Sequence, residues 1–247
     1  MCALIYGSDG SGKSGLALSY LDKEDIVKGN KMVIIDMDGG TEPLMYTYHQ
    51  DKVKNILFHN PLELITTTDG QIELDSIKIL YKIKAIIYWT KNNYEKENIK
   101  LIVLDGLGKL LTICEQQMRL DNNIDPNGQV ALRFWMTRNK LFLEIIEIVK
   151  SLPISKIFIA HEDFRPNPIT SVEEQMSQVK IKTNAMIYTK IFMTRIDKLD
   201  HVIFKAKIDK NKYKLALEGK EYLVGSVEKN SNKIIWKGNE VINDLKN

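Results

Sequence analysis

Gly7-Ser8-Asp9-Gly10-Ser11-Gly12-Lys13-Ser14 lies between an apolar run at residues 3–6 and a helical-looking run that begins at Gly15. It matches the pattern G-x-x-x-x-G-K-[ST] at every defined position. The glycines let the backbone curl so that successive N–H groups face phosphate oxygens, and the following helix points its positive end at the same charge. We expect Lys13 to reach the β- and γ-phosphates and the Ser14 hydroxyl to bind Mg²⁺.

A second pattern overlaps the first, because Gly10, Gly12 and Gly15 also satisfy G-x-G-x-x-G, and Asp36 stands near the place of a ribose-binding acid. This dinucleotide interpretation is weaker, since it gives no reason for the run Gly-Lys-Ser. A Gly/Ser-rich turn with an incidental lysine is disfavoured because strand, loop and helix follow in the required order. The expected nucleotide-binding residues are Gly7, Ser8, Asp9, Gly10, Ser11, Gly12, Lys13, Ser14 and Gly15.

The composition is that of a globular chain. Its 247 residues are 44% apolar and include only six prolines, and no Gly/Ser/Pro linker divides them, so one domain spanning residues 1–247 is expected. The 35 basic and 32 acidic residues give a net charge of +3, a balance that neither supports nor excludes a DNA partner. Two cysteines without a C-x-x-C pair indicate a reducing compartment. With no signal peptide or long apolar run, a cytoplasmic protein without a membrane partner is expected.

Three further strands are expected to end in polar residues at one edge of a parallel sheet. The run at residues 31–36 leads into Asp36 and Asp38, either of which could equally be a helix cap or a loop acid. The run at residues 99–105 ends in Asp105, which would hold the Mg²⁺ hydration shell together with the phosphate loop. The run at residues 156–160 delivers His161, Glu162 and Asp163.

Helices and irregular segments connect these strands. A short strand is expected at residues 55–58, helices at about 74–89 and 107–120, and an exposed loop at 121–129. The apolar residues of the first helix form a stripe that we interpret as core-facing: Leu74, Ile77, Leu80, Tyr81, Ala85, Tyr88 and Trp89. At residues 133–140 aromatic and basic residues interleave, which suits base stacking and phosphate binding, although Phe134 and Trp135 could instead be core residues.

The pattern changes near residue 184 to strands and tight turns. Strands are expected at residues 186–194, 201–207 and 212–216, with a turn at 209–211. Lysines crowd this region, at positions 205, 207, 210, 212 and 214. They could form a solvated, charge-guarded sheet edge, or some of them could reach phosphate in this subunit or a neighbour.

Taken together, these motifs resemble the RecA/RadA-like ATPases, and most of all the short RadA-like ATPases of phages and archaeal viruses, which include single-strand-annealing recombinases. The resemblance covers about residues 1–217 and leaves residues 218–247 as an extension. It implies a RecA-like α/β fold, with a mostly parallel central sheet flanked by helices and C-terminal antiparallel strands. Because the first strand is expected almost at Met1, we expect no amino-terminal polymerisation element, and filament formation is not implied.

The resemblance also implies roles for individual residues. Asp38 would polarise the attacking water, although the family usually has Glu there, and His161 would sense the γ-phosphate. Lys205 and Lys207 resemble paired lysines that act on the adjacent subunit's nucleotide. The loops that contact DNA would correspond to about residues 121–138 and 163–182.

Three functions follow as expectations. The first is an ATPase that uses ATP and Mg²⁺ and acts on DNA, with single-stranded DNA favoured, in recombination, replication or packaging. It would work as a homo-oligomer in the cytoplasm, with the host cell of a virus or plasmid as one setting. The second is a nucleotide-dependent switch with slow hydrolysis and a protein partner. The third, a small-molecule phosphotransferase, would need a lid built from Arg119, Arg133 and Arg138.

Overall fold

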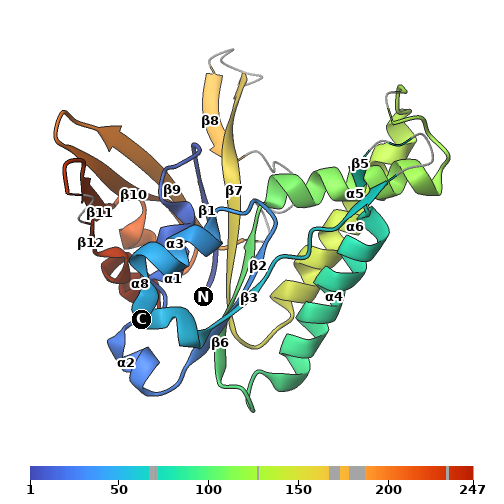
Figure 1. Cartoon of the computed structure of the whole chain (residues 1–247). Coiled ribbons are helices and arrows are strands. Elements are labelled where there is room, and N and C mark those ends of the chain that lie inside the picture. The colour runs from blue at the N-terminus through green and yellow to red at the C-terminus, as the bar shows by residue number, and fades with distance from the viewer. Residues whose placement is uncertain are drawn as a thin grey trace.

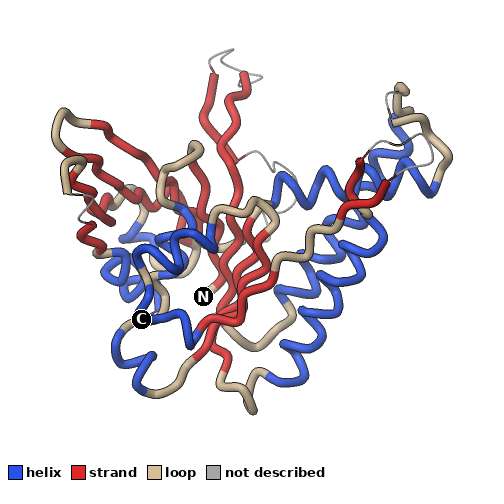
Figure 2. The backbone as a smooth tube through the Cα atoms, viewed as in Figure 1, coloured by secondary structure: helices blue, strands red, loops and turns tan. Residues whose placement is uncertain are grey.

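The computed structural model describes residues 1–66, 70, 72–126, 128–166, 173–177, 187–231 and 234–246, with backbone only for 164–166 and 173–177. Within these residues, ten strands form one sheet in the order β12-β11-β10-β9-β1-β7-β6-β2-β3, and β8 pairs with β7 off this path. Figure 1 shows helices on both faces of the sheet, and Figure 2 shows the strands as one continuous layer. The expected α/β fold with a mostly parallel sheet is confirmed.

Parallel strands make up the centre of the sheet and antiparallel strands extend one side of it. The parallel strands are β9 (Thr189–Asp197), β1 (Cys2–Gly7), β7 (Ser155–Pro166), β6 (Ile99–Asp105), β2 (Lys31–Asp36) and β3 (Ile56–His59). The antiparallel ones are β10 (His201–Asn211), β11 (Glu221–Glu228), β12 (Ile234–Trp236) and β8 (Glu173–Ser177). A separate hairpin consists of β4 (Leu64–Thr66) and β5 (Ile72–Leu74).

Two helical layers cover the central strands. One contains α4 (Ser76–Asn93), α5 (Leu107–Asp121) and α6 (Leu132–Lys150), and the other α1 (Lys13–Leu18), α3 (Thr41–Tyr48) and α8 (Gly238–Lys246). Shorter helices are α2 (Lys23–Val27) and the 3₁₀ turns η1 (Gln50–Asn55) and η2 (Leu215–Leu217). No helix of the described segments is long and apolar enough to cross a bilayer.

Strand β1 shows why the central sequences are apolar at every position. Leu4 packs in the core beneath α4, α5 and α6, whereas its neighbours Ala3 and Ile5 pack in the core beneath α1 and α8. Because side chains alternate between the two faces, a strand covered on both sides needs an unbroken apolar run. Each fully buried Leu or Ile contributes roughly 1.5–3 kcal/mol to folding. This burial fixes the position of each strand along its axis in the sheet, and so fixes where the loops that follow the strands begin.

Helix α4 buries a different face from the expected one. Its core residues are Ile79, Ile83 and Ile87, which recur every fourth residue, together with Leu80. Ile77 and Tyr81 of the expected stripe are 61% and 74% exposed. The stripe was misassigned because α4 carries apolar residues on both faces, and spacing alone does not tell which face meets the sheet.

The strands near the C-terminal end also differ from expectation. Strand β10 continues through residues 209–211, so the expected turn there and the strand at 212–216 are wrong. Asp209 makes a tertiary contact instead, because it accepts from the Tyr6 hydroxyl. Asn211 does make local turn-like bonds, since its side-chain oxygen accepts from the backbone N–H groups of Tyr213 and Lys214, so the chain bends only after β10 has ended. Residue 186, the expected start of the preceding strand, lies outside the described residues, and β9 begins at Thr189.

Candidate active site

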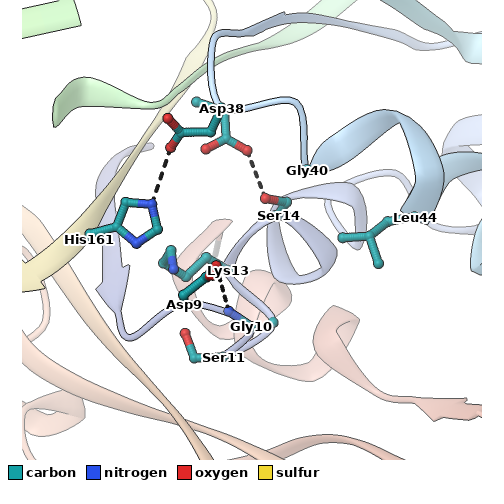
Figure 3. A pocket seen from close by; sticks show the side chains of 11 residues that line it. Asp9, Gly10, Ser11, Lys13, Ser14, Asp38, Gly40, Leu44 and His161 are labelled. Atoms are coloured by element: carbon teal, nitrogen blue, oxygen red, sulfur yellow. Dashed lines mark hydrogen bonds and ion pairs between the residues drawn. The ribbon is translucent and has the colours of Figure 1, made fainter. Parts of the chain in front are cut away.

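A cavity of about 420 Å³ opens where β1, β2 and β6 end, beside His161 of β7 (Figure 3). Among the residues expected to bind nucleotide or metal, those lining it are Asp9, Gly10, Ser11, Gly12, Lys13, Ser14, Asp38, Asp105 and His161, joined by Gly40 and Leu44. Gly7, Ser8 and Gly15 belong to the same loop and helix but do not line the cavity. The structure therefore brings residues from four strands of distant sequence to one place.

The phosphate loop wraps around the Lys13 side chain. Gly10 and Gly12 have φ values of 66° and 87°, a left-handed conformation that residues with a Cβ rarely adopt. Lys13 Nζ donates to the carbonyl oxygens of Gly7, at 3.2 Å, and Ser8, at 2.7 Å. Burial lowers the Lys13 pKa, and the side chain is only 7% exposed. The ammonium is thus held inside the loop on two carbonyls that it can exchange for phosphate oxygens.

Ser14 and Asp105 form a direct hydrogen bond, with 2.7 Å between Ser14 Oγ and Asp105 Oδ2. The hydroxyl of Thr41, at the start of α3, donates to the same carboxylate oxygen over 2.8 Å. Burial raises the Asp105 pKa to about 6, although both hydroxyls oppose that rise. The pair predicted for the metal is therefore in place, with Thr41 as a third member.

Asp36 and Asp38 have different surroundings. Asp36 is fully buried, and its carboxylate accepts from the backbone N–H groups of Asp38, Gly39 and Thr41, so it caps the loop before α3 and is not available to a ribose. Asp38 instead lines the cavity, where its Oδ2 lies 3.3 Å from His161 Nε2 (Figure 3).

His161 lies within a strand and not at its end. Strand β7 continues to Pro166 and pairs with β8 there, whereas the sequence predicts an end at residue 160. His161 nevertheless lies opposite Gly7 in the register of β1, at the height where the phosphate loop begins. His161 therefore lies beside the acids, as expected, although the strand that carries it does not end there.

Strand β9 and the antiparallel strands beyond it form a wall along the phosphate loop. A methyl group added to Gly7 would lie 2.3 Å from the Met193 carbonyl oxygen, and one added to Gly10 would lie 3.3 Å from Arg195 Nη1. Further along, Phe204 lies against Gly12. Strands β9 and β10 therefore follow the loop from its first glycine to the helix.

The indole of Trp236, in β12, completes this wall. It lies against Gly12 and Gly15, and a methyl group on Gly15 would come within 2.7 Å of the ring. The indole N–H donates to the hydroxyl of Ser19, the residue that follows α1. Gly15 is thus a position where the helix packs closely against the indole. This packing explains why the third position of the overlapping G-x-G-x-x-G pattern is a glycine.

Lys205 and Lys207 lie away from this cavity. Both are at the surface and line a separate hollow of about 480 Å³, together with Tyr6 and Phe192. Lys205 Nζ lies 3.7 Å from a carboxylate oxygen of Glu221. Tyr6 and Phe192 alternate with residues that pack beneath α1, so the lysines are on the sheet face opposite the phosphate loop.

The two segments expected to contact DNA are described unequally. Residues 167–172 and 178–186 lie outside the described part, which removes most of the segment 163–182. In the other segment, Phe134 and Trp135 are half-buried and absent from both cores, so their interpretation as core residues is wrong. The Arg133 guanidinium lies 4.8 Å from the Phe134 ring centre, and that of Arg138 lies 4.5 Å from the Trp135 ring centre.

Thr41, Arg195 and Trp236 are the site residues that sequence reasoning missed. Thr41 follows a Gly-Gly pair without a recognisable motif, and the other two are far from the loop in sequence. One signal was present, because Gly15 has no role in the phosphate loop pattern and a glycine at a helix start can mark close packing.

Comparison with known proteins gives a family and shows which solved structures have a similar fold. A family model described as an AAA domain matches residues 1–233. The crystal structure of a KaiC-like protein from the hyperthermophilic archaeon Pyrococcus horikoshii is similar, with a TM-score of 0.53 and 13% identity over 95% of this chain and 88% of that chain. No curated protein matches the chain by sequence.

Proposed function

Because the chain belongs to the AAA-domain family and is a P-loop ATPase, we propose that it hydrolyses ATP with Mg²⁺ and couples this reaction to DNA as a homo-oligomer. The observation that carries the proposal is the convergence of three groups in one cavity: Lys13 in the loop, the Ser14–Asp105 pair, and the Asp38–His161 pair. Each group has the chemistry that phosphoryl transfer to water requires.

The residues present fit Mg²⁺. Ser14 and Asp105 offer a hydroxyl and a carboxylate within 2.7 Å of each other, and oxygen ligands of this kind are the ones Mg²⁺ prefers. Among the described residues, no three His, Cys, Asp or Glu side chains are grouped so that they could hold a metal ion, so the ion would take its other ligands from phosphate and water. When bound, Mg²⁺ supplies positive charge that offsets the charge of the phosphates.

The chain's own residues carry the remaining tasks. Lys13 leaves the carbonyls of Gly7 and Ser8 and donates to the phosphate oxygens. Asp38 accepts a hydrogen bond from the attacking water and so orients it. His161 holds the Asp38 carboxylate in place through their 3.3 Å contact. His161 also lines the cavity, where it can donate to the terminal phosphate.

The first half of α6 supports DNA binding. Two arginine–aromatic pairs lie there, Arg133 with Phe134 and Arg138 with Trp135, and such pairs combine phosphate neutralisation with base stacking. Figure 1 shows α5 and α6 extending beyond the sheet as an arm, which leaves this segment accessible. Arg119, in contrast, bonds Glu115 and two backbone carbonyls, which disfavours a lid built from the three arginines.

The positions of Lys205 and Lys207 support an oligomer. Since they are on the sheet face opposite their own phosphate loop, their contribution to catalysis would be to a neighbour's nucleotide. Surface lysines in a hollow of about 480 Å³ are accessible to a second subunit. A trans cation of this kind offsets charge that develops in the transition state.

ATP hydrolysis with and without single- and double-stranded DNA tests the proposal. We expect stimulation by DNA, greater for single strands, and loss of that stimulation in Arg133→Gln/Arg138→Gln. Lys140→Gln, a charge change at an exposed position of α6, serves as the control and should keep it. Slow hydrolysis unaffected by either DNA would support the switch with a protein partner instead, and phosphate transfer to an acceptor other than water would support the phosphotransferase.

A further inference from the structure

Acidic groups outnumber basic ones in the cavity. Of its described lining residues, Asp9, Asp38 and Asp105 are carboxylates, and Lys13 is the only lysine or arginine. A nucleoside triphosphate adds several more negative charges to this site. A second permanent cation near the phosphate loop would therefore strengthen binding.

Arg195 is the cation best placed for this task. Strand β9 pairs in parallel with β1, with Met193 opposite Gly7, and Arg195 is two residues further along the same face. Its Nη1 lies 3.3 Å from the position of a methyl group on Gly10, the residue at the tip of the phosphate loop. The guanidinium thus reaches the loop from the side opposite β6 and β7.

Asp197 holds this guanidinium in a fixed orientation. Arg195 Nε and Nη2 donate to the two carboxylate oxygens of Asp197, over 2.9 and 3.0 Å. A bidentate pair fixes the plane of the guanidinium, and it leaves Nη1, which donates to no described residue, on the side of Gly10. The geometry is that of an arginine positioned by one acid for a second anion.

The loop tip already binds an anionic oxygen. The Gly10 N–H donates to its neighbour's carboxylate, Asp9 Oδ1, over 2.9 Å. A backbone donor at Gly10 and a guanidinium nitrogen beside it therefore form a pair of groups that favour negative charge. A phosphate oxygen that replaces the Asp9 carboxylate would meet both donors.

We propose that Arg195, oriented by Asp197, is a second cation for the bound nucleotide and donates from Nη1 to the phosphate chain of its own subunit's ATP. The inference rests on the proposed nucleotide site and adds a residue that the phosphate loop pattern does not contain. Lys13, Ser14 and Asp38 act on the side of β6 and β7, where the reaction takes place. Arg195 instead contacts phosphates that ATP and ADP share, so it contributes equally to the ground state and the transition state.

Calorimetric titration with ADP and with a non-hydrolysable ATP analogue tests this inference in the full chain. Arg195→Gln should raise Kd for both ligands by the same factor, about tenfold, because a charge-assisted hydrogen bond is lost. KM for ATP should rise in parallel while kcat stays close to its original value. Asp197→Asn should give a smaller increase, because the guanidinium remains but its orientation is no longer fixed.

Two further variants make the outcomes unambiguous. Lys198→Gln removes one positive charge from the same hairpin at an exposed position and should leave both Kd values unchanged. Lys13→Ala should abolish binding of both ligands; if it did not, the nucleotide site itself would be wrong. Normal affinity in Arg195→Gln beside lost affinity in Lys13→Ala would overturn the role of Arg195 alone. A Kd effect limited to the ATP analogue, or a drop in kcat at unchanged KM, would also overturn it.

Discussion

At the scale of single residues, two carboxylates two positions apart are fixed for different tasks. Asp36 accepts three backbone hydrogen bonds and is fully buried, whereas Asp38 contacts His161 in the cavity. A buried acceptor that loses its partners costs stability, and an acid that orients water costs rate when it is neutralised. The same chemical change at the two positions should therefore have separable effects.

We expect Asp38→Asn to lower kcat by about 100-fold or more while the free energy of unfolding and the affinity for ATP stay near their original values. Asp36→Asn should lower the free energy of unfolding by about 1–3 kcal/mol, because an amide offers one acceptor oxygen where the carboxylate uses two. Steady-state hydrolysis and urea denaturation of both variants measure this difference. Equal kcat for Asp38→Asn and the unaltered protein would remove Asp38 from the mechanism.

His49 gives the protein a pH-dependent stability. It follows α3, is 4% exposed, and lies edge-on to Trp236 with 6.0 Å between ring centres. Burial, followed by the nearby Lys52 charge, lowers the His49 pKa from 6.5 to about 4. Because the unfolded chain takes up the proton more readily, the stability due to neutral His49 is complete above about pH 6.5 and is lost as the pH falls toward 4.

This titration predicts that the free energy of unfolding falls by about 2–3 kcal/mol between pH 7 and pH 4 on account of His49. Denaturation across this range should show a smaller decrease in His49→Gln, whose side chain does not titrate. Other groups near this side chain, Asp51 and Lys52, are retained in the variant and act as internal controls. An identical pH dependence in both proteins would contradict the assignment to His49.

Sequence reasoning reached some of these residues and not others for physical reasons. Lys13 and Ser14 are defined by a local pattern, and Asp105 and His161 come at the ends of short apolar runs, so the phosphate loop and the end of β6 could be predicted, although β7 continues past His161 to Pro166. Thr41 and Arg195 are brought to the site by contacts between segments 64 and 185 positions apart, Thr41 with Asp105 and Arg195 with Gly10. A local pattern carries no information on contacts of that range.

At the scale of elements, the short strand β12 determines how the phosphate loop is supported. Trp236 lies against Gly12 and Gly15 and its indole N–H bonds Ser19, so one side chain contacts both the loop and the helix that follows it. Helix α8 then packs in the same core as α1 through Val241 and Ile242. The packing of β12 and α8 therefore maintains the position of α1.

Gly15→Ala tests this support. A methyl group there would lie 2.7 Å from the indole, so we expect the free energy of unfolding to fall by about 1–3 kcal/mol through overpacking. Gly40→Ala is the matched control, because Gly40 has an ordinary φ of −87° and open space around it. Thermal and urea denaturation of both variants give the comparison. A loss for Gly15→Ala no greater than for Gly40→Ala would mean that the indole moves aside at little cost.

Helices and strands were predictable where the hydrophobic pattern was regular and a residue that ends such elements marked their boundary. Strands β2 and β6 and helix α5 match their expected ranges closely, because each is a clear apolar run or stripe. Strand β10 was cut short because Asp209 and Asn211 are common in turns, while here Asp209 accepts from Tyr6 on β1 and the bend begins only after Asn211, whose side chain accepts from the backbone of Tyr213. Strands β11 and β12 had no expectation, since exposed residues such as Leu223 and Ile235 break their alternation.

At the scale of the whole molecule, the two sheet faces beyond β1 are unequal. The face with Met193 and Phe204 lies over the phosphate loop, and the opposite face presents Tyr6, Phe192, Lys205 and Lys207 in an open hollow. If a neighbour's nucleotide fills this hollow, each catalytic unit consists of one subunit's loop and another subunit's lysines.

Mixing of inactive variants tests this arrangement. Lys205→Ala/Lys207→Ala should bind ATP normally but turn it over slowly, and Lys13→Ala should be inactive. Mixed oligomers should regain activity, since at one class of interface an intact loop faces intact lysines. The control mixes Lys13→Ala with the triple variant Lys13→Ala/Lys205→Ala/Lys207→Ala. This mixture contains no intact phosphate loop, so it should show no rescue. Near-normal turnover of Lys205→Ala/Lys207→Ala on its own would reject the role in trans.

The hydrogen bond between Trp236 and Ser19 joins residues 217 positions apart, and it has a consequence for how the protein reaches its native state. Contacts of such long range form late, because a large loop must close before they add stability. The phosphate loop is encoded within the first fifteen residues, yet its supporting wall is complete only after β12 has docked. ATP would therefore bind only to a chain that has finished folding. In a refolding experiment, the time at which nucleotide binding begins would report when β12 docks.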